Sequence, residues 1–266
     1  MEKMKELILI KLGGSVITDK GREYTAREGN IIRLAGEIKE VQRKFNGKII
    51  IGHGAGSFAH TPAHKYKTKE GLINKDSLYG MAVTEDAAKK LNMIVVKNFL
   101  EEGIPVFSFS PASFLISDVK VCDKSYFDSI KKALEIGIVP VVYGDVVIDR
   151  KIGCTIFSTE KILSILAREL QKKYKIKTIY VTDTDGVYDE KSKTIGEINA
   201  KNFAKLKSSI VGAKGVDVTG GMLHKVEEAL NLAKKTGIKT LIINGKVKGS
   251  LKNAILGKKV GGTLIS

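Results

Sequence analysis

The sequence feature that most constrains the fold is a run of β-branched residues that ends in closely spaced glycines. Ile49–Ile51 is followed by the segment Gly52–His60 (GHGAGSFAH). The isoleucine run is typical of a buried strand, and the glycines predict a tight turn that opens toward a helix. Glycines allow a ligand to approach the backbone closely, and the N–H groups of such a turn attract an anion. We therefore predict that this loop binds an anionic, phosphorylated small molecule.

Patterns typical of strands and of helices alternate along the rest of the chain. The expected strands are 7–12, 49–51, 104–110, 138–143, 177–182, 240–244 and 262–265. The expected helices are 25–45, 77–102, 125–136, 159–173 and 222–235, with a short helix before the last strand. We also expect a hairpin over 146–153 and a mobile polar excursion over 65–76. The alternation predicts an α/β fold with an open, mostly parallel sheet that is flanked by helices on both faces.

The composition is that of an ordinary globular protein in a reducing compartment. A chain of 266 residues is long enough for one large domain or for two lobes that share a sheet. No apolar run reaches the length of a membrane span, and the first residues lack the apolar core of a signal peptide. Cys122 and Cys154 lack C-x-x-C spacing, so we expect unpaired thiols, a cytoplasmic location and no membrane partner.

The net charge of +16 has two explanations. A basic surface binds nucleic acids because it releases counterions from the phosphates. However, the lysines are spread along the whole chain, and neither a basic helix nor the aromatic pattern of an RNA-binding motif is present. We therefore expect a lysine-rich solvated surface and no nucleic-acid partner, with some electrostatic attraction of an anionic substrate.

Two more glycine-rich turns lie where a strand or loop leads into a helix. They are Gly13–Ser15 (GGS) and Gly220–Gly221. Ligands of open α/β sheets bind beyond the carboxyl ends of the strands, so three such turns together favour a polyphosphate. The sequence G-x-x-x-x-G-K-[ST] is absent, and the segment from Gly52 lacks the third glycine of the dinucleotide fingerprint. An ordinary P-loop ATPase and an NAD enzyme are therefore disfavoured.

Three lysines are candidates for binding phosphates. Lys11 lies at the end of a strand that should be buried on both faces, and a buried lysine requires a partner. Its ammonium group should emerge beside the glycines, where a phosphate can pair with it, although a lysine that merely extends to solvent stays an alternative. Lys20 and Lys225 are similar candidates, and for Lys20 a plain surface position is a serious alternative.

The histidines and aspartates do not form a recognisable metal motif. His53, His60 and His64 lie close in sequence, but a proline separates the last two, and neither H-E-x-x-H nor a neighbouring cysteine is present. We therefore predict that no side chains of this chain form a metal site. Asp183 and Asp185 could serve Mg²⁺ or a ribose, or could only shape a turn, since Asp-Gly is a common turn pair.

Four segments together resemble the amino acid kinase superfamily. They are Lys11–Ser15 (KLGGS), His53–Ser57 (HGAGS), Asp183–Tyr188 (DTDGVY) and Asp217–Met222 (DVTGGM). Within that superfamily, the extension of the second segment to His60, Gly144–Val147 (GDVV) and the run that ends at Lys225 are similar to the isopentenyl phosphate kinases. The resemblance covers nearly the whole chain.

This resemblance implies an activity, a substrate and an assembly. Members of the family phosphorylate isopentenyl monophosphate with ATP and Mg²⁺ in isoprenoid synthesis, giving isopentenyl diphosphate and ADP. They are cytoplasmic homodimers, so we expect a small-molecule phosphate substrate and a homodimer here. The resemblance also implies an N-terminal lobe, 1–172, that binds the acceptor and forms the dimer, and a C-terminal lobe, 173–266, that binds the nucleotide.

The same resemblance implies roles for individual residues. The catalytic residues would be Lys11, Lys20 and His60. The ATP-binding residues would be Lys11, Gly13, Gly14, Ser15, Ala55, Gly56, Asp183, Gly220 and Lys225. The acceptor-binding residues would be Gly54, Ala55, His60 and Thr159.

The chain departs from the family pattern at one place in the expected site. Phe157–Glu160 (FSTE) replaces the usual Ile-Ser-Gly-Asp, so Thr159 stands where a glycine would let the backbone approach the acceptor phosphate. The acceptor therefore stays open among isopentenyl phosphate, another phosphate, a phosphonate such as fosfomycin, and a carboxylate. A nucleic-acid-binding or regulatory protein on a degenerate kinase fold is the alternative from a different class.

Overall fold

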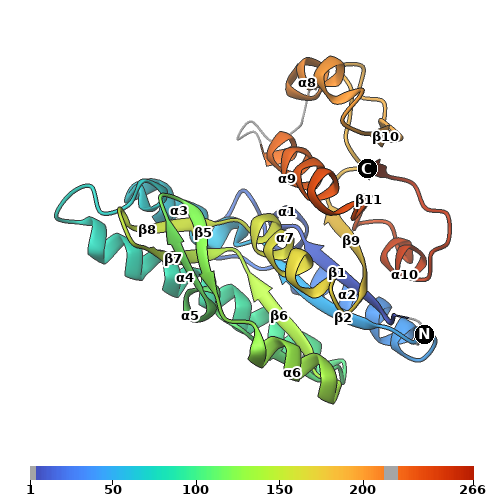
Figure 1. Ribbon diagram of the computed structural model, residues 1–266, viewed down its shortest axis with the longest axis horizontal. Helices are drawn as coiled ribbons and strands as arrows, with labels where there is room; N and C mark the ends of the chain where they lie inside the picture. Colours follow the sequence, from blue (N-terminus) through green and yellow to red (C-terminus); the bar gives the residue numbers. More distant parts are fainter. Residues whose placement is uncertain (1–3, 213–220) are drawn as a thin grey trace.

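An eight-stranded sheet forms the centre of the structure, a computed structural model that describes residues 4–212 and 221–266 (Figure 1). The strand order is β10-β12-β11-β9-β1-β2-β6-β3, and all neighbours are parallel except β11 and β12. The bounds are β1 Glu6–Leu12, β2 Lys48–His53, β3 Val106–Ser108, β6 Val139–Tyr143, β9 Lys175–Thr182, β10 Glu197–Ile198, β11 Thr240–Asn244 and β12 Thr263–Ile265. The predicted open, mostly parallel sheet is confirmed.

Strand β1 lies between β2 and β9 and is buried on both faces. Leu7 and Leu9 belong to one hydrophobic cluster and Ile8 and Ile10 to the other, because successive side chains of a strand point to opposite faces. None of the four is exposed to solvent. The same alternation places Lys11, at the carboxyl end of β1, on the face of Leu7 and Leu9.

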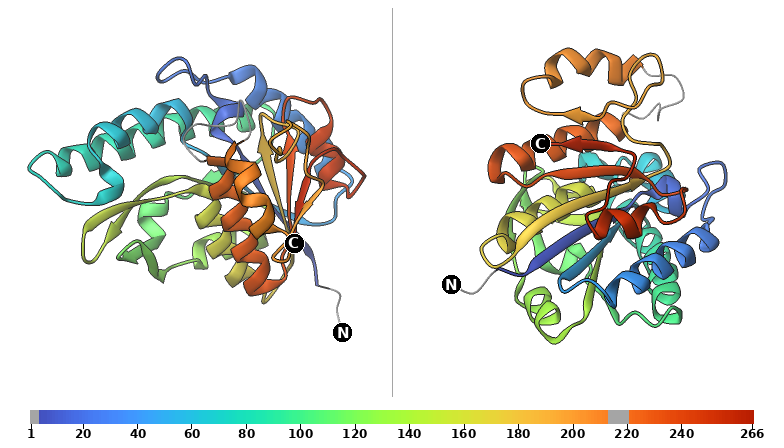
Figure 2. Two further views of the ribbon diagram at one scale, coloured as in Figure 1. Left: turned by 90° about the horizontal axis from the view of Figure 1, so that it is seen from above. Right: turned by 90° about the vertical axis from the view of Figure 1, so that its right-hand side faces the viewer.

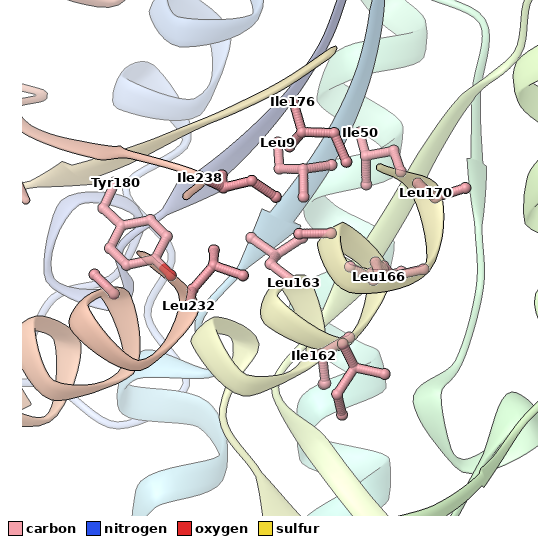
Figure 3. Close-up of a cluster of buried hydrophobic side chains, with 14 of the residues drawn as sticks. Leu9, Ile50, Ile162, Leu163, Leu166, Leu170, Ile176, Tyr180, Leu232 and Ile238 are labelled. Carbon is pink, nitrogen blue, oxygen red and sulfur yellow. The ribbon is translucent and has the colours of Figure 1, made fainter. Parts of the chain in front are cut away.

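Helices cover both faces of this sheet. The face of Leu9 is covered by α6 (Asp128–Ile136), α7 (Thr159–Leu170) and α9 (Gly221–Thr236). Figure 3 shows apolar side chains of α7 and α9 in the same cluster as Leu9. The other face is covered by α2 (Glu28–Gln42), α4 (Ser77–Glu101) and α10 (Ser250–Ile255). The other helices are α1 (Gly14–Ile17), α3 (Gly56–Lys65), the 3₁₀ helix η1 (Thr68–Glu70), α5 (Pro111–Phe114) and α8 (Phe203–Gly212). Within the described ranges, no helix has the length and apolar character needed to cross a bilayer.

The sequence pattern does not predict a second sheet, which has the strand order β5-β4-β7-β8. The bounds are β4 Leu115–Asp118, β5 Val121–Ser125, β7 Asp145–Asp149 and β8 Gly153–Phe157. Together with α4 it extends away from the main sheet (Figure 2). The expected hairpin over 146–153 is the antiparallel pair of β7 and β8. Strand β5 is almost wholly exposed. Its sequence, VCDKS, lacks the alternation of apolar and polar residues that predicts a half-buried strand.

The polar segment 65–76, whose mobility stays a prediction, lies beside β8. The amide of Leu72 donates a hydrogen bond to the carbonyl of Ile152 at 2.8 Å. The buried hydroxyl of Thr68 lies 3.0 Å from that of Thr84 on α4. The polarity of this segment does not predict the contacts, because Ile152 and Thr84 lie in other parts of the chain.

Candidate functional site

Two glycine loops meet backbone to backbone at the carboxyl ends of β1 and β2. A Cβ atom on Gly14 would lie 2.7 Å from the Cα of Gly56, and one on Gly54 would lie 3.0 Å from the amide nitrogen of Gly14. Real Cβ atoms essentially never lie 2.7 Å from another atom, so the close approach of the loops requires glycine at position 14, and a Cβ at position 54 would press on the backbone of Gly14. The arrangement can offer backbone N–H groups from two strand ends to one anion.

The loop after β1 is also bonded to β9 and to the turn that follows it. The amide of Gly13 donates to the carbonyl of Val181 at 2.8 Å. Two residues later, the hydroxyl of Ser15 donates to Oδ1 of Asp183 at 2.7 Å. Asp183, which we predicted to bind ATP, therefore contacts a predicted phosphate-binding residue directly.

A buried carboxylate, Glu160, pairs with the predicted phosphate-binding lysines. Its ion pair with Lys11 is closed to solvent, since the two residues are 4% and 5% exposed. Nζ of Lys225 lies 4.0 Å from the same carboxylate and donates to the carbonyl of Gly221 at 2.8 Å. Burial raises the pKa of Glu160, but Lys11 and then Lys225 outweigh this effect and hold the pKa at about 2. Glu160 therefore stays ionised and keeps two ammonium groups together.

Thr159 fits the site because two glycines leave room for its side chain. Its hydroxyl donates to the carbonyl of His53 at 2.7 Å. A Cβ on Gly52 would lie 2.7 Å from the methyl carbon of Thr159, and a Cβ on Gly144 would lie 3.1 Å from its hydroxyl oxygen. The side chain that replaces the usual glycine is thus directed toward the ends of β2 and β6, where its hydroxyl is already bonded.

A cavity of about 860 Å³ connects these features. The predicted site residues that line it are Lys11, Gly13, Gly14, Ser15, Lys20, Gly54, Ala55, Gly56, His60, Thr159 and Lys225. Asp183 is outside this lining and contacts it through Ser15. Gly220 lies outside the described residues. All the predicted residues except Asp183 and Gly220 therefore converge on one cavity from distant parts of the chain, while the role of each stays a prediction.

Sequence reasoning missed several cavity residues. The sequence marks Glu160 only as a departure from the family pattern. It marks Asp145 only as a member of the segment Gly144–Val147. Ser158, as the N-cap of α7, and His224, on α9, also line the cavity. No local pattern marks His224, because its neighbours in the cavity come from elsewhere in the chain.

Asp145 is a buried carboxyl group in the wall of the cavity. It is 2% exposed, its Oδ1 accepts from the amide of Val146 at 2.8 Å, and its Oδ2 accepts weakly from Ser110 at 3.3 Å. Burial raises the pKa of Asp145 to about 7, and the nearby carboxylate of Glu85 adds to the rise. Near neutral pH this group can therefore be either charged or neutral.

His53 supports the glycine loop from behind. Its ring is fully buried, stacks on Tyr143 with centroids 5.5 Å apart, and places Nε2 3.1 Å from Oδ1 of Asn92. Burial lowers the pKa of His53, which favours the neutral ring. Across the described part of the chain, no three His, Cys, Asp or Glu side chains gather as metal ligands.

Known proteins resemble this chain in sequence and in fold. Residues 6–244 match the Amino acid kinase family. The chain is 36% identical over 270 residues to isopentenyl phosphate kinase of Methanothermobacter thermautotrophicus, with 98% of this chain and 99% of that protein aligned. It is 34% identical to isopentenyl phosphate kinase of Methanocaldococcus jannaschii, over 96% and 97% of the two chains. A crystal structure of isopentenyl phosphate kinase superposes with a TM-score of 0.84 at 33% identity, covering 98% of this chain and all of that one.

Proposed function

Because this chain belongs to the amino acid kinase family and, within it, to the isopentenyl phosphate kinases, we propose that it transfers the γ-phosphoryl group of ATP to isopentenyl phosphate. The products are isopentenyl diphosphate and ADP. The observation that carries the proposal is the buried pairing of Glu160 with Lys11 beside two glycine loops in one cavity.

The acceptor needs no general base in this reaction. A phosphate monoester has a second pKa of about 6, so at neutral pH it is largely a dianion and already nucleophilic. An oxygen of the acceptor forms the new bond to the γ-phosphorus while the bond to the β–γ bridging oxygen breaks and ADP leaves. The obstacle is the repulsion between two anions, which cations and fixed N–H dipoles reduce.

The residues of the cavity supply those charges and dipoles. The amides of Gly54 to Gly56 lie between the two phosphates, and His60 binds the acceptor phosphate. Lys11 and Lys20 stabilise the transferring group. Glu160 keeps Lys11 and Lys225 close together before the ligand arrives, so less of their motion has to be frozen during the reaction.

ATP binds through Lys11, Gly13–Ser15, Asp183 and Lys225, with Gly220 assigned to the same group. Mg²⁺ is commonly held by substrate phosphates and one or two carboxylates rather than by a protein cage, so we assign it to the phosphates of ATP. When bound, it offsets part of the phosphate charge. The acceptor lobe is 1–172 and the nucleotide lobe is 173–266, within a cytoplasmic enzyme.

An apolar edge of the sheet supports a homodimer. Strand β3 is at the end of the sheet and exposes 58% of Phe107. On α4, which contacts β3, Met93 and Leu100 are 68% and 51% exposed and lie seven residues apart on one helical face. Light scattering should give twice the mass of the 29.0 kDa chain, and Phe107→Asp should yield monomers; a monomeric parent protein would contradict the dimer.

An acceptor panel tests the activity. Purified protein is incubated with radiolabelled ATP, Mg²⁺ and isopentenyl phosphate, fosfomycin, glutamate or no acceptor. We expect label transfer to isopentenyl phosphate with the highest kcat/KM. Faster transfer to fosfomycin or glutamate would reassign the acceptor, and salt-dependent RNA binding without ATP turnover would support the degenerate-fold alternative.

A further inference from the structure

A hydrogen bond between two cavity residues links α7 to α9. Oγ of Ser158 and Nε2 of His224 are 3.2 Å apart. Ser158 directly precedes Thr159 and Glu160, and His224 directly precedes Lys225. The bond therefore connects the helix that carries the buried carboxylate to the helix that carries one of its two lysine partners.

The apolar contact between the helices does not by itself fix their cavity ends. Leu166 and Leu170 of α7 and Leu232 of α9 share one hydrophobic cluster over the sheet (Figure 3). Burial of apolar surface is favourable but not directional. A hydrogen bond depends on angle as well as distance, so the contact of Ser158 with His224 specifies how the two helix ends are placed.

The Ser158 hydroxyl has the capacity for this bond in either protonation state of the imidazole. Its oxygen already accepts from the amide of Lys161 at 3.2 Å, as the N-cap of α7. The O–H can still donate to an unprotonated Nε2, and the remaining lone pair can accept from a protonated one. The bond therefore does not require a charged histidine.

We propose that His224 is a positioning residue that, through its bond to Ser158, sets the place of Lys225 relative to Glu160 and Lys11. Lys225 follows His224 on the first turns of α9 and lies 4.0 Å from Glu160. Loss of the bond lets the cavity end of α9 move, and Lys225 moves with it. This inference rests on the proposed function, in which Lys225 binds the phosphates of ATP.

Two uncharged substitutions of His224 differ in whether they keep the hydrogen bond. His224→Gln keeps a side chain that can bond to Ser158, whereas His224→Leu removes the bond. We expect the leucine variant to lose about two- to tenfold in kcat/KM for ATP, the range that one net hydrogen bond supplies. Its affinity for the ATP analogue AMPPNP with Mg²⁺ should fall similarly, while the KM for isopentenyl phosphate stays unchanged. The glutamine variant should stay within about twofold of the parent.

A double-mutant cycle with Ser158→Ala completes the test. If the two residues act through one bond, the double variant Ser158→Ala/His224→Leu is no more impaired than the worse single variant. Because Ser158→Ala also removes a helix cap, the Tm of each variant is recorded, and the coupling is taken from the cycle.

Three results would overturn the inference: equal losses in the glutamine and leucine variants, an unimpaired leucine variant, or additive effects in the cycle. Failure of the proposed function is recognised separately, by a parent protein that does not phosphorylate isopentenyl phosphate. AMPPNP binding still reports on the bond in that case, because it requires no acceptor.

Discussion

Two sides of the cavity differ in how their polar groups are paired. The glycine side is formed by Lys11, Gly13–Ser15, Gly54–Gly56 and Glu160, where backbone packs on backbone and the buried charges have opposite partners. The α4 side is formed by Ala59, Thr84, Ala88 and Asp145, and the buried carboxyl group of Asp145 has only a weak side-chain donor. The glycine side is therefore held together by its own contacts, whereas the α4 side carries a buried carboxyl group whose pKa is raised to about 7.

The difference predicts how mutations act on each side. On the glycine side the groups hold one another in place, so one substitution disturbs several contacts. The resulting loss of activity or stability should be large. On the α4 side a substitution should change one property in a graded manner. Substitutions of Lys11, Gly14 and Asp145 test this contrast, and a substitution of His60 tests a contact with the acceptor.

Lys11→Met should have the largest effect, a fall in kcat of about 10²- to 10³-fold, because it removes a cation from the place where charge develops. Steady-state kinetics with isopentenyl phosphate measures it. The control is Lys177→Met, which removes an exposed lysine that pairs with Glu6 away from the cavity. A kcat within about threefold of the parent would remove Lys11 from the chemistry.

Gly14→Ala should destabilise the protein by about 1–3 kcal/mol, because the new methyl group meets the backbone of Gly56. Denaturant unfolding measures the free energy. Gly29→Ala is the matched control, since a Cβ at this helical position meets nothing within 4 Å. It should be neutral or slightly stabilising, and equal losses in both variants would refute the requirement for glycine at the loop contact.

His60→Ala should raise the KM for isopentenyl phosphate by about tenfold while kcat changes less, because a charge-assisted contact to the acceptor phosphate is lost. Initial rates at varied acceptor and saturating ATP separate the two constants. His64→Ala, four residues later on the same helix and outside the cavity lining, should leave both unchanged. An unaltered acceptor KM in the first variant contradicts the role of His60.

Asp145→Asn should change how stability depends on pH. The folded-state pKa of Asp145 is raised from 3.8 to about 7, so between these values the folded protein holds a proton that the unfolded chain has released. The parent protein should therefore lose stability as pH rises from about 4 through about 7, with a slope below the limit of about 1.4 kcal/mol per pH unit. The asparagine variant should lack this component, and parallel stability profiles between about pH 5 and pH 8 would show that Asp145 does not titrate as proposed.

The sequence predicts the glycine side well and the α4 side poorly. Strands β1 and β2 and their glycine loops are local patterns, so they could be predicted, and Lys11 followed from its place at a strand end. Its partner Glu160 could not, because 149 residues separate the two and only the folded chain brings them together. Strand β5 carries no alternation, and the high pKa of Asp145 depends on burial by distant elements.

Gly52 and Gly144 leave the space that the side chain of Thr159 occupies. This arrangement restricts the order in which mutations at these positions are tolerated. A side chain at position 52 collides with the threonine methyl carbon and with Leu163, so such a change is tolerated only after position 159 has become small. The change Thr159→Gly has no such requirement, because the carbonyl of His53 loses the bond from the threonine hydroxyl but keeps the one from the amide of Gly144 at 3.1 Å. Under laboratory evolution, Thr159→Gly should therefore appear before Gly52 is replaced by a larger residue. The opposite order should not occur.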